Sequence, residues 1–383
     1  MGFGAIIASG ESNGLLAEDI MGCLTEVRVE QFLDQPTRFA LRFQEDLQDG
    51  EPRIAQSAEL QAEQIITIAV AVGDRLVCLA RGPITERRSS MTVGGPGSFY
   101  EVRGTDRRIE MSRVCRQRCW EGRASEAVAA ILSDHGFEVD VQETTRVYEE
   151  STGTLNQRAT DHDFVQNLAR QNNLAFWISC AAQLGLTGNL EVEETAHFTS
   201  SPPRPAGGVG SALPSLPLVP DTAVVMRVNV VKEQCPNVTA FDLSVNAERP
   251  TRSPGTAIDD RAVAPQSIAA ADTQPAVVDG GRSLSSIATA ERSICLATAG
   301  NQEELQVRSD AALTEAGWFA TATAATTAHM LRGVLQPHQV IQVEGLGRTD
   351  SGAYQITAVT HVINAADHSQ DIQLRRNAIG QAP

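Results

Sequence analysis

Apolar residues alternate with polar or small ones along two long stretches of this chain, one near each end. Val27 and Val29 begin the first stretch, and Ile372 and Leu374 close the second. A period of two places neighbouring side chains on opposite faces of a strand, so both stretches predict antiparallel strands with one buried face. The Gly73-Asp74 pair lies between two alternating runs, a position typical of a hairpin turn.

Between the two stretches the apolar period becomes helical. Val128, Ile131 and Leu132 fall at helical spacing, and Gly136 is placed to end that helix. The run 160–163 fits a capping box, with the Thr160 hydroxyl accepting from a backbone N–H and the Asp163 side chain reaching back. The apolar stripe that follows predicts a second buried helix, with docking of a partner helix as the alternative, and consists of Phe164, Val165 and Leu168.

The expected fold class is mainly β with a small α/β part, in the order β, α/β, β, and the first β part reads as an antiparallel sheet or barrel. Segment 201–220 contains six prolines and three glycines, so it cannot join a helix or a central strand. The expected divisions are an N-terminal arm at 1–23, the first β part at 24–112, the α/β domain at 113–200, a Pro/Gly-rich linker or loop at 201–220, and a second β part at 221–383 with a long insertion at 250–305. Residues 1–22 are read as irregular, and a Pro/Ala-rich stretch at 250–275 is expected to interrupt the second set of strands.

The charge balance narrows the class of protein. The 383 residues include 31 Lys plus Arg against 47 Asp plus Glu, a formal net charge of −16, which is typical of an acidic soluble protein and not of a nucleic-acid clamp. The longest uncharged run, 171–190, carries several amides, so no membrane-spanning helix is expected. The first ten residues lack the basic stretch of a secretory signal, and the protein is expected to be cytoplasmic when made.

Motifs for catalysis and cofactor binding are missing from the sequence. The four Gly-x-Gly pairs lack the third glycine of a dinucleotide turn, and no phosphate loop, Gly-x-Ser-x-Gly elbow or His-Glu-x-x-His motif occurs. The Asp161-His162-Asp163 cluster could serve acid/base chemistry, but a helix cap explains it without catalysis. No catalytic, cofactor-binding or metal-binding residue is therefore nominated.

The seven cysteines are odd in number and spread over the whole chain, which argues against a small secreted disulfide scaffold. Most are expected to be buried small residues. Cys115 and Cys119 could also form half of a zinc site, but the surrounding arginines disfavour a bound cation and make the thiols more reactive. Disulfides in an extracellular particle are the remaining alternative, with the candidate cysteines Cys23, Cys115, Cys119, Cys235 and Cys295.

Several motifs together resemble one known family. In order along the chain they are Phe99-Tyr100-Glu101-Val102-Arg103-Gly104-Thr105-Asp106, Ala127 to Leu132 with His135-Gly136-Phe137, Leu155 to Arg170, Gln342 to Gly347 with Ser351-Gly352-Ala353-Tyr354, and Leu374-Arg375-Arg376-Asn377-Ala378. This succession resembles the phage late control D proteins, which include baseplate hubs of contractile tails and the hub portion of type VI secretion spike proteins. The resemblance implies that both β parts are tube-like β-barrels, on either side of the α/β domain, and the order β, α/β, β agrees with it.

The resemblance implies a structural hub in the baseplate of a virion tail, assembled in the bacterial cytoplasm. Three chains would present six β-barrels, so that a homotrimer matches a hexameric tail tube above and a central spike below. Other baseplate proteins would surround it, DNA or cargo could pass through its lumen, and no cofactor or stable membrane insertion is implied. The chain stops at Pro383, without the β-needle of type VI spikes, so a separate spike protein is expected.

Three alternatives remain open at this stage. The hub could belong to an extracellular contractile injection system or a tailocin instead of a phage. A tail-associated hydrolase that cuts cell wall would need a paired acid and base in a cleft. An adhesive or carbohydrate-binding β protein would normally expose more aromatic residues than the 4% present here.

Overall fold

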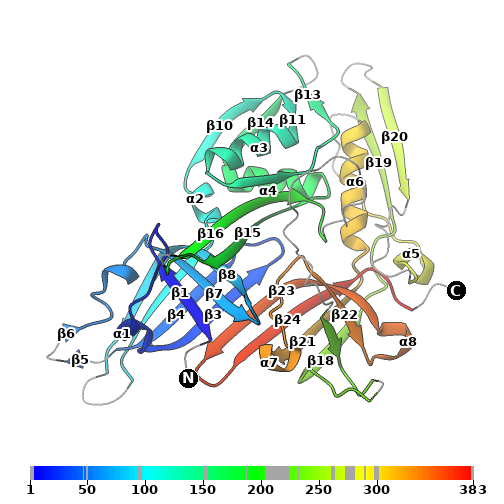
Figure 1. Ribbon diagram of the computed structural model, residues 1–383. Helices are drawn as coiled ribbons and strands as arrows, with labels where there is room; N and C mark the ends of the chain where they lie inside the picture. Colours follow the sequence, from blue (N-terminus) through cyan, green and yellow to red (C-terminus); the bar gives the residue numbers. More distant parts are fainter. Residues whose placement is uncertain are drawn as a thin grey trace.

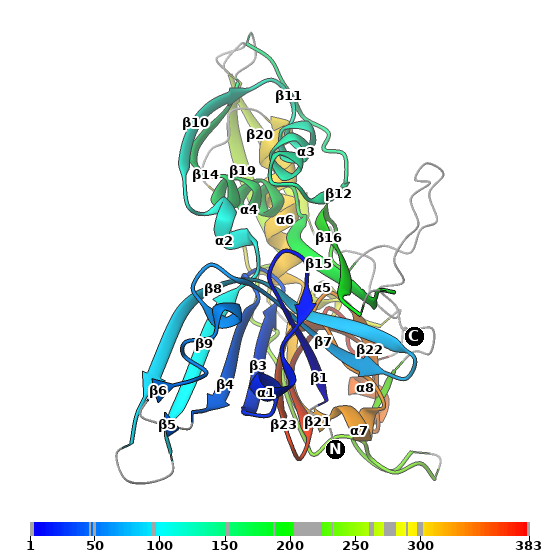
Figure 2. The same cartoon turned by 60° about the vertical axis from the view of Figure 1, so that its left-hand side comes forward.

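The computed structural model describes residues 4–45, 47–48, 51–92, 97–150, 154–186, 188–202, 224–231, 233–259, 264–271, 281–288, 290–296 and 302–380. A wide sheet fills the lower part of Figure 1, and a smaller unit of helices and strands lies above it. Figure 2 shows the same two layers from a second direction. The predicted mainly β class with a small α/β part is confirmed.

One sheet of 13 strands contains both alternating stretches. Its order is β18-β21-β24-β23-β3-β4-β9-β8-β7-β1-β2, and β17 joins it through β22, which pairs with β23. The N-terminal strands, here called the first β region, are β1 (Ala5–Ser9), β2 (Gly14–Leu15), β3 (Leu24–Phe32), β4 (Arg38–Gln44), β7 (Ile65–Val72), β8 (Arg75–Ser90) and β9 (Phe99–Thr105). The C-terminal strands, the second β region, are β17 (Val225–Arg227), β18 (Ala240–Val245), β21 (Ala320–Thr327), β22 (Val340–Glu344), β23 (Gly352–Asn364) and β24 (His368–Arg376).

The first β region folds back over its own core at the long strand β8. This strand pairs with β7 as far as Pro83 and with β9 from Ile84 onward. A Cβ atom at Gly82 would overlap the backbone carbonyl of Thr105, so the bend requires a residue without a side chain. The apolar faces of β1 and β7 thereby meet those of β3, β4 and β9, and the enclosed residues include Ile7, Leu41, Phe43, Ile68 and Val102.

Strand β23 joins the two β regions. Its first residues pair with β22, residues Gln355 to Ile363 pair with β24, and residues Ala358 to Asn364 pair antiparallel with β3 from Phe32 to Glu26. The second β region keeps a separate core on one face of this sheet, which includes Tyr354, Ile356, Val359, Ile372 and Leu374. Each β region thus has its own hydrophobic core, while the β3–β23 pairing joins the strands of both regions into one continuous sheet.

The α/β unit lies above the sheet and contains the predicted helices. Its elements are α2 (Arg108–Met111), β10 (Cys115–Trp120), β11 (Gly122–Arg123), α3 (Ala124–Asp134), β12 (Glu138–Val141), β13 (Val147–Tyr148), β14 (Leu155–Thr160), α4 (Asp161–Gln171), β15 (Ala175–Leu184) and β16 (Leu190–Thr199). The predicted apolar stripes of α3 and α4 are both buried in one core with Phe176 and Phe198 of the β15–β16 hairpin. Gly136 ends α3 with a φ of +77°, as the sequence indicated.

The insertion stands beside the α/β unit at the right of Figure 1. It consists of the hairpin β19 (Arg252–Asp259) and β20 (Ala264–Ala271), the short helix α5 (Leu284–Ile287), and helix α6 (Gln302–Ala316), which packs against that hairpin. An ion pair between Arg146 and Glu304 connects α6 to the α/β unit. The remaining short elements are α1 (Glu18–Met21), β5 (Leu47–Gln48), β6 (Glu51–Pro52), the 3₁₀ helix η1 (Ala58–Leu60), α7 (Ala328–Leu331) and α8 (Gly347–Asp350).

The expectation of an irregular N-terminal arm was wrong: in the described part of 1–23, β1 pairs with β7 along its whole length and buries Ala5, Ile7 and Ala8. The Pro/Ala-rich stretch 250–275 interrupts the strands of the second β region, because its described residues form the separate hairpin β19–β20 between β18 and β21. The Pro/Gly-rich segment 201–220 is described only at Ser201 and Pro202.

Candidate functional site

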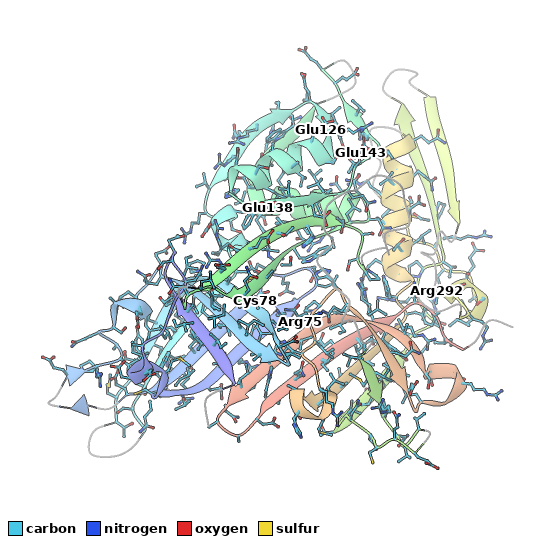
Figure 3. All side chains as sticks on the ribbon, viewed as in Figure 1. Arg75, Cys78, Glu126, Glu138, Glu143 and Arg292 are labelled. Atoms are coloured by element: carbon cyan, nitrogen blue, oxygen red, sulfur yellow. A yellow bond between two sulfur atoms is a disulfide. The ribbon has the colours of Figure 1, made fainter. Side chains whose placement is uncertain are left out.

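Three parts of the fold meet where the β15–β16 hairpin descends from the α/β unit onto β8. The segment 336–338 of the second β region lies against the same place, and together these residues enclose a cavity of about 70 Å³. We call this meeting point the joint. Figure 3 shows Cys78, one of its residues, at the boundary between the sheet and the unit above it.

A buried ion pair lies at the base of the joint. The Arg108 guanidinium is 1% exposed and donates to the Asp106 carboxylate at 2.7 Å. Arg108 also donates to the backbone carbonyls of Gln35 at 2.7 Å and Phe176 at 3.4 Å, which belong to different parts of the fold. The same oxygen of the Asp106 carboxylate also accepts from the Thr37 N–H at 2.7 Å. These hydrogen-bond partners come from different parts of the fold. The buried ion pair therefore has all of them only when the first β region and the α/β unit are docked.

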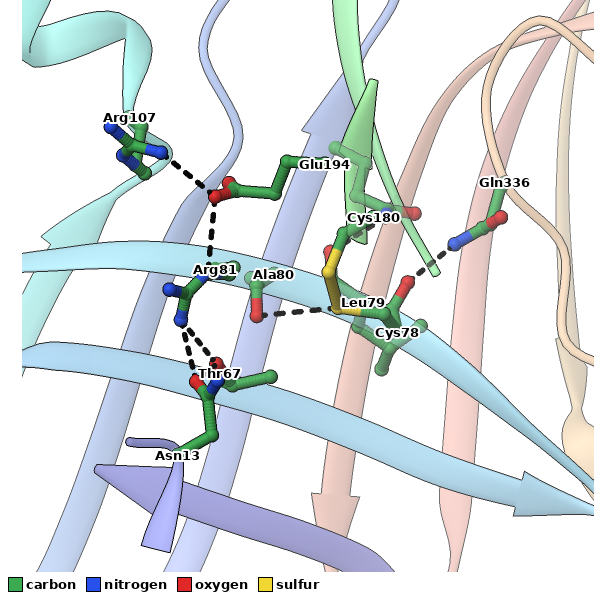
Figure 4. Close-up of a disulfide and its surroundings, with 11 residues drawn as sticks. Asn13, Thr67, Cys78, Leu79, Ala80, Arg81, Arg107, Cys180, Glu194 and Gln336 are labelled. Atoms are coloured by element: carbon green, nitrogen blue, oxygen red, sulfur yellow. Dashed lines mark hydrogen bonds and ion pairs between the residues drawn. A yellow bond between two sulfur atoms is a disulfide. The ribbon is translucent and has the colours of Figure 1, made fainter. Parts of the chain in front are cut away.

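Glu194 forms a second ionic contact across the joint (Figure 4). Its carboxylate lies 3.0 Å from Arg81 of β8 and 3.1 Å from Arg107, which precedes α2. The Arg81 and Glu194 side chains are only 10% and 9% exposed, so solvent screens this attraction little. Arg81 also donates to the Asn13 side-chain carbonyl at 2.6 Å, which continues the network into the N-terminal segment.

A disulfide between Cys78 of β8 and Cys180 of β15 crosses the joint. Neither residue is among the candidate cysteines, because the pairing depends on the docking of β15 against β8 and not on a local pattern. The expectation that most cysteines are buried was also wrong: Cys115, Cys119, Cys235 and Cys295 have exposed free thiols. The thiol of Cys23 donates to the backbone carbonyl of Asp19 at 3.4 Å. Pairing of these five cysteines between chains stays a prediction.

Trp177 is stacked between two histidines at the upper side of the joint. Its ring centroid lies 4.7 Å from that of His197 and 3.9 Å from that of His338, with nearly parallel planes. Complete burial holds the pKa of His338 well below its ordinary value, with a further contribution from the positive charge of Arg108. The neutral His338 accepts or donates one hydrogen bond with the Ser201 hydroxyl at 2.9 Å.

Ser179, His197 and Asp140 form a continuous chain of hydrogen bonds on the same face. The Ser179 hydroxyl lies 2.7 Å from His197 Nε2, and the Asp140 carboxylate lies 2.9 Å from His197 Nδ1. These residue types at these distances match the relay of serine hydrolases. Here Trp177 covers the imidazole and Ser179 faces the 70 Å³ cavity of the joint, which is smaller than an ordinary substrate site.

The sequence did not reveal this chain because its members come from β12, β15 and β16, three adjacent strands. Asp140 lies directly opposite His197 in the parallel pair β12–β16, and Trp177 lies opposite His197 in the antiparallel pair β15–β16. Register between strands places them together, and no local motif encodes register.

A polar relay connects the joint to the second β region. The Gln355 amide donates to the Ser201 hydroxyl at 2.7 Å, and Arg375 Nε donates to the Gln355 carbonyl at 2.8 Å. Arg375 in turn lies 3.1 Å from the Glu315 carboxylate at the end of α6. The insertion, the second β region and the joint are therefore linked through a short series of side chains.

The two β regions share a histidine pair at the β3–β23 seam. His361 Nδ1 lies 3.0 Å from His368 Nε2, and His361 Nε2 lies 3.3 Å from the Gln31 carbonyl oxygen. Gln31 also donates to the Leu79 carbonyl at 2.8 Å. The pair is buried at the seam, and burial lowers the pKa of His361 to about 3 and that of His368 to about 4.

The Asp161-His162-Asp163 cluster is divided among structural roles. Thr160 caps α4 by accepting from the Asp163 N–H at 3.1 Å, and its hydroxyl donates to the Asp163 carboxylate at 2.8 Å. Asp161 is buried and contacts Arg116 and His135, each at 3.0 Å. Burial lowers the pKa of His162, whose ring faces Phe176. The cap interpretation is confirmed, with the Asp163 carboxylate meeting the Thr160 hydroxyl instead of its N–H.

Within the described residues, no group of three His, Cys, Asp or Glu side chains is arranged to hold a metal ion. No helix in the described part of the chain is long and apolar enough to cross a membrane.

Comparison with known proteins finds similarity in structure alone. No protein-family model and no curated protein matches the chain. A tail protein from Neisseria meningitidis MC58 superimposes with a TM-score of 0.61 at 13% identity, covering 99% of this chain and 98% of that one. The 43 kDa tail protein of prophage MuSo2 from Shewanella oneidensis gives 0.61 at 14% identity, covering 97% and 98%.

A third similar structure comes from a secretion machine. An Escherichia coli component of the type VI secretion system, described as similar to T4 bacteriophage tail proteins gp27 and gp5, gives a TM-score of 0.52 at 13% identity and covers 94% of this chain and 76% of that one. At these identities the likeness establishes the fold. The chain has the fold of these tail and secretion-system proteins.

Proposed function

We propose that this chain is the structural baseplate hub of a contractile tail, a homotrimer that joins a hexameric tail tube to a central spike. The observation that carries the proposal is the likeness to two tail proteins over nearly the whole length of every chain involved. Such coverage includes both β regions and the α/β unit, so the resemblance is not limited to one common module. The earlier resemblance to late control D proteins is consistent with it but rests on short motifs.

Two β regions per chain supply the symmetry that an adaptor needs. Each region curls around its own core, and the β3–β23 pairing fixes their relative position. Three chains would then present six similar β surfaces to a sixfold tube while keeping threefold symmetry toward a spike.

The ends of the sheet suggest how a ring would close. Among the described strands of the 13-stranded sheet, β18 and β2 end the main path and β17 ends the branch through β22, so each has one side without a neighbouring strand of that sheet. Open edges promote uncontrolled association unless they are covered. Pairing or covering of these edges by neighbouring subunits would both close a trimer and remove that hazard.

The joint supports a mechanical role without catalysis. Buried ionic, stacked and covalent contacts cross between all three parts of the fold at one place, which is suited to transmitting force without relative movement. The protein would assemble in the bacterial cytoplasm and function in the virion tail baseplate, with other baseplate proteins around it and DNA or cargo passing through the lumen. The hub of an injection system or tailocin is the close variant, favoured by the E. coli secretion component.

Light scattering of the full chain, alone and with the neighbouring spike and tube proteins, tests this proposal. We expect a trimer, either alone or once the spike is added. A mass that stays monomeric with both partners would contradict it.

A cell-wall hydrolase is the second candidate, since Ser179, His197 and Asp140 form a relay of the right chemistry. The joint would have to open to admit a substrate. A peptidoglycan-release assay with the protein and its Ser179→Ala variant tests this: activity lost in the variant would favour the enzyme, and no release by either would favour the hub.

A further inference from the structure

The Cys78–Cys180 disulfide connects two parts of the fold that other contacts already hold together. Cys78 belongs to β8 of the first β region and Cys180 to β15 of the α/β unit, 102 residues further along, with their Cα atoms 5.7 Å apart. Strands β8 and β15 lie in direct contact along this boundary. Figure 4 shows the bond between the strands, close to the ionic network of Glu194.

The surrounding contacts do not depend on the sulfur–sulfur bond. Arg81 and Glu194 form their ion pair across the same boundary, and the Gln336 amide donates to the Cys78 carbonyl at 2.7 Å. A small apolar cluster that contains Ala8, Ala69 and Leu190 packs the end of the β15–β16 hairpin against β1 and β7. The joint can therefore dock with two thiols, which would already lie within bonding reach.

The two cysteines differ in exposure. Cys78 is 3% exposed, whereas Cys180 is half-buried, and both line the 70 Å³ cavity. A thiol or disulfide from solution would accordingly meet Cys180 first, and Cys78 would act as the second, resolving thiol.

We propose that Cys78 and Cys180 form a redox-operated lock, in which the joint docks as a dithiol and is then cross-linked by exchange with a small disulfide such as oxidised glutathione. The Cys180 thiolate attacks one sulfur of the small disulfide and releases one thiol, which leaves a mixed disulfide on Cys180. The Cys78 thiolate then attacks the Cys180 sulfur and releases the second thiol. Two protein thiols are oxidised, one small disulfide is reduced to two thiols, and the two protein protons end on the released thiols.

The joint would be uncrosslinked while the protein folds and assembles, and cross-linked afterwards. A chain made in a reducing cytoplasm keeps the dithiol, because glutathione and thioredoxin oppose structural disulfides there. Contact with an oxidising environment closes the bond on a joint that is already docked. The exchange chemistry concerns the chain itself, whereas the timing of the cross-link rests on the proposed function.

The test is a redox titration of the folded full-length protein. The protein is equilibrated with graded mixtures of reduced and oxidised glutathione, and free thiols are then trapped with N-ethylmaleimide. Mass spectrometry of the peptides that contain each cysteine measures which thiols were free. We expect Cys78 and Cys180 to become reduced together while circular dichroism and resistance to trypsin stay unchanged, and to re-form the bond in oxidised glutathione. A bond that reduces only after denaturant is added, or a reduced chain that loses its fold, would overturn the proposal.

Single variants test the order of exchange. Cys78→Ser should accumulate a glutathione adduct on Cys180, whereas Cys180→Ser should leave Cys78 unmodified; adducts on Cys78 to the same extent would contradict the assigned order. The oxidised protein should melt about 3–6 °C above the reduced one, because the cross-link restricts the unfolded chain. Cys115→Ser, at an exposed free thiol, is the matched control and should keep this difference, while the double variant of Cys78 and Cys180 should lose it. An equal melting temperature for oxidised and reduced wild-type protein would count against a lock.

Discussion

The rings of Trp177 and His338 stack with their centroids 3.9 Å apart and their planes 18° from parallel. Trp177 belongs to β15 of the α/β unit, whereas His338 precedes β22 of the second β region. The stack exists only when these two parts are docked. The loss in the free energy of unfolding when it is removed therefore measures its contribution to the docking.

His338→Ala is expected to lower the free energy of unfolding by about 1–3 kcal/mol, since it removes the stack and the hydrogen bond to Ser201. His329→Ala is the matched control, because His329 is exposed and a surface change should stay within about 0.5 kcal/mol. Urea titrations of both variants measure the difference. Similar losses in the two would show that the stack contributes nothing.

Arg108→Met should cost about 3–5 kcal/mol, because Asp106 is then left as a buried carboxylate without its partner. Arg28→Met is the control: the Arg28–Glu30 pair is exposed, and its loss should cost less than about 1 kcal/mol. Adding Asp106→Leu to Arg108→Met should recover part of the stability by removing the uncompensated charge. A double variant that is no better than the single one would contradict this account.

The His361–His368 pair predicts a loss of stability in acid. Both pKa values lie far below the ordinary value of about 6.5 expected in the unfolded chain, so between pH 6.5 and about 3 the unfolded state binds more protons than the folded state. The contribution of the neutral pair is therefore complete above pH 6.5 and is lost as the pH falls toward 3.

Urea midpoints at pH 7.5 and pH 5 for the wild type and for His361→Gln test this dependence. The variant should be less sensitive to pH than the wild type, and the exposed-site variant His329→Ala should behave like the wild type. An identical pH dependence in His361→Gln and the wild type would assign the acid sensitivity to other groups.

Thr160→Ala should destabilise the protein by about 1 kcal/mol, because the Asp163 N–H at the start of α4 loses its acceptor. Thr160→Ser keeps the hydroxyl and should stay close to the wild type. Thermal unfolding followed by helix-sensitive circular dichroism provides the measurement. If the alanine and serine variants melt together, the cap is unimportant for stability.

The elements that depend on local pattern could be predicted from the sequence. Val27 and Val29 are fully buried on β3, and Val165 and Leu168 are buried on α4, as their spacing indicated. Buried side chains recur every two residues in a strand and every three or four in a helix. A short window of sequence is therefore enough to predict which residues of a helix or strand are buried.

The joint could not be predicted, because it depends on strand register and on the docking of distant segments. Cys78 sits between Leu76 and Ala80 in an alternating run, which is the pattern of an ordinary core residue. Cys180 lies in the middle of β15, which continues to Leu184. The later part of β15 carries the hairpin down to β8, where the two cysteines meet.

The pairing of β3 with β23 also determines the order in which the chain can fold during synthesis. Residues Glu26 to Phe32 leave the ribosome early, but their partners Ala358 to Asn364 are made among the last. Contacts of such high sequence separation slow folding, and the waiting edge of β3 is open to association with other chains. Until translation is nearly complete, the edge of β3 that faces β23 has no partner from its own chain, because β4 pairs with the opposite edge.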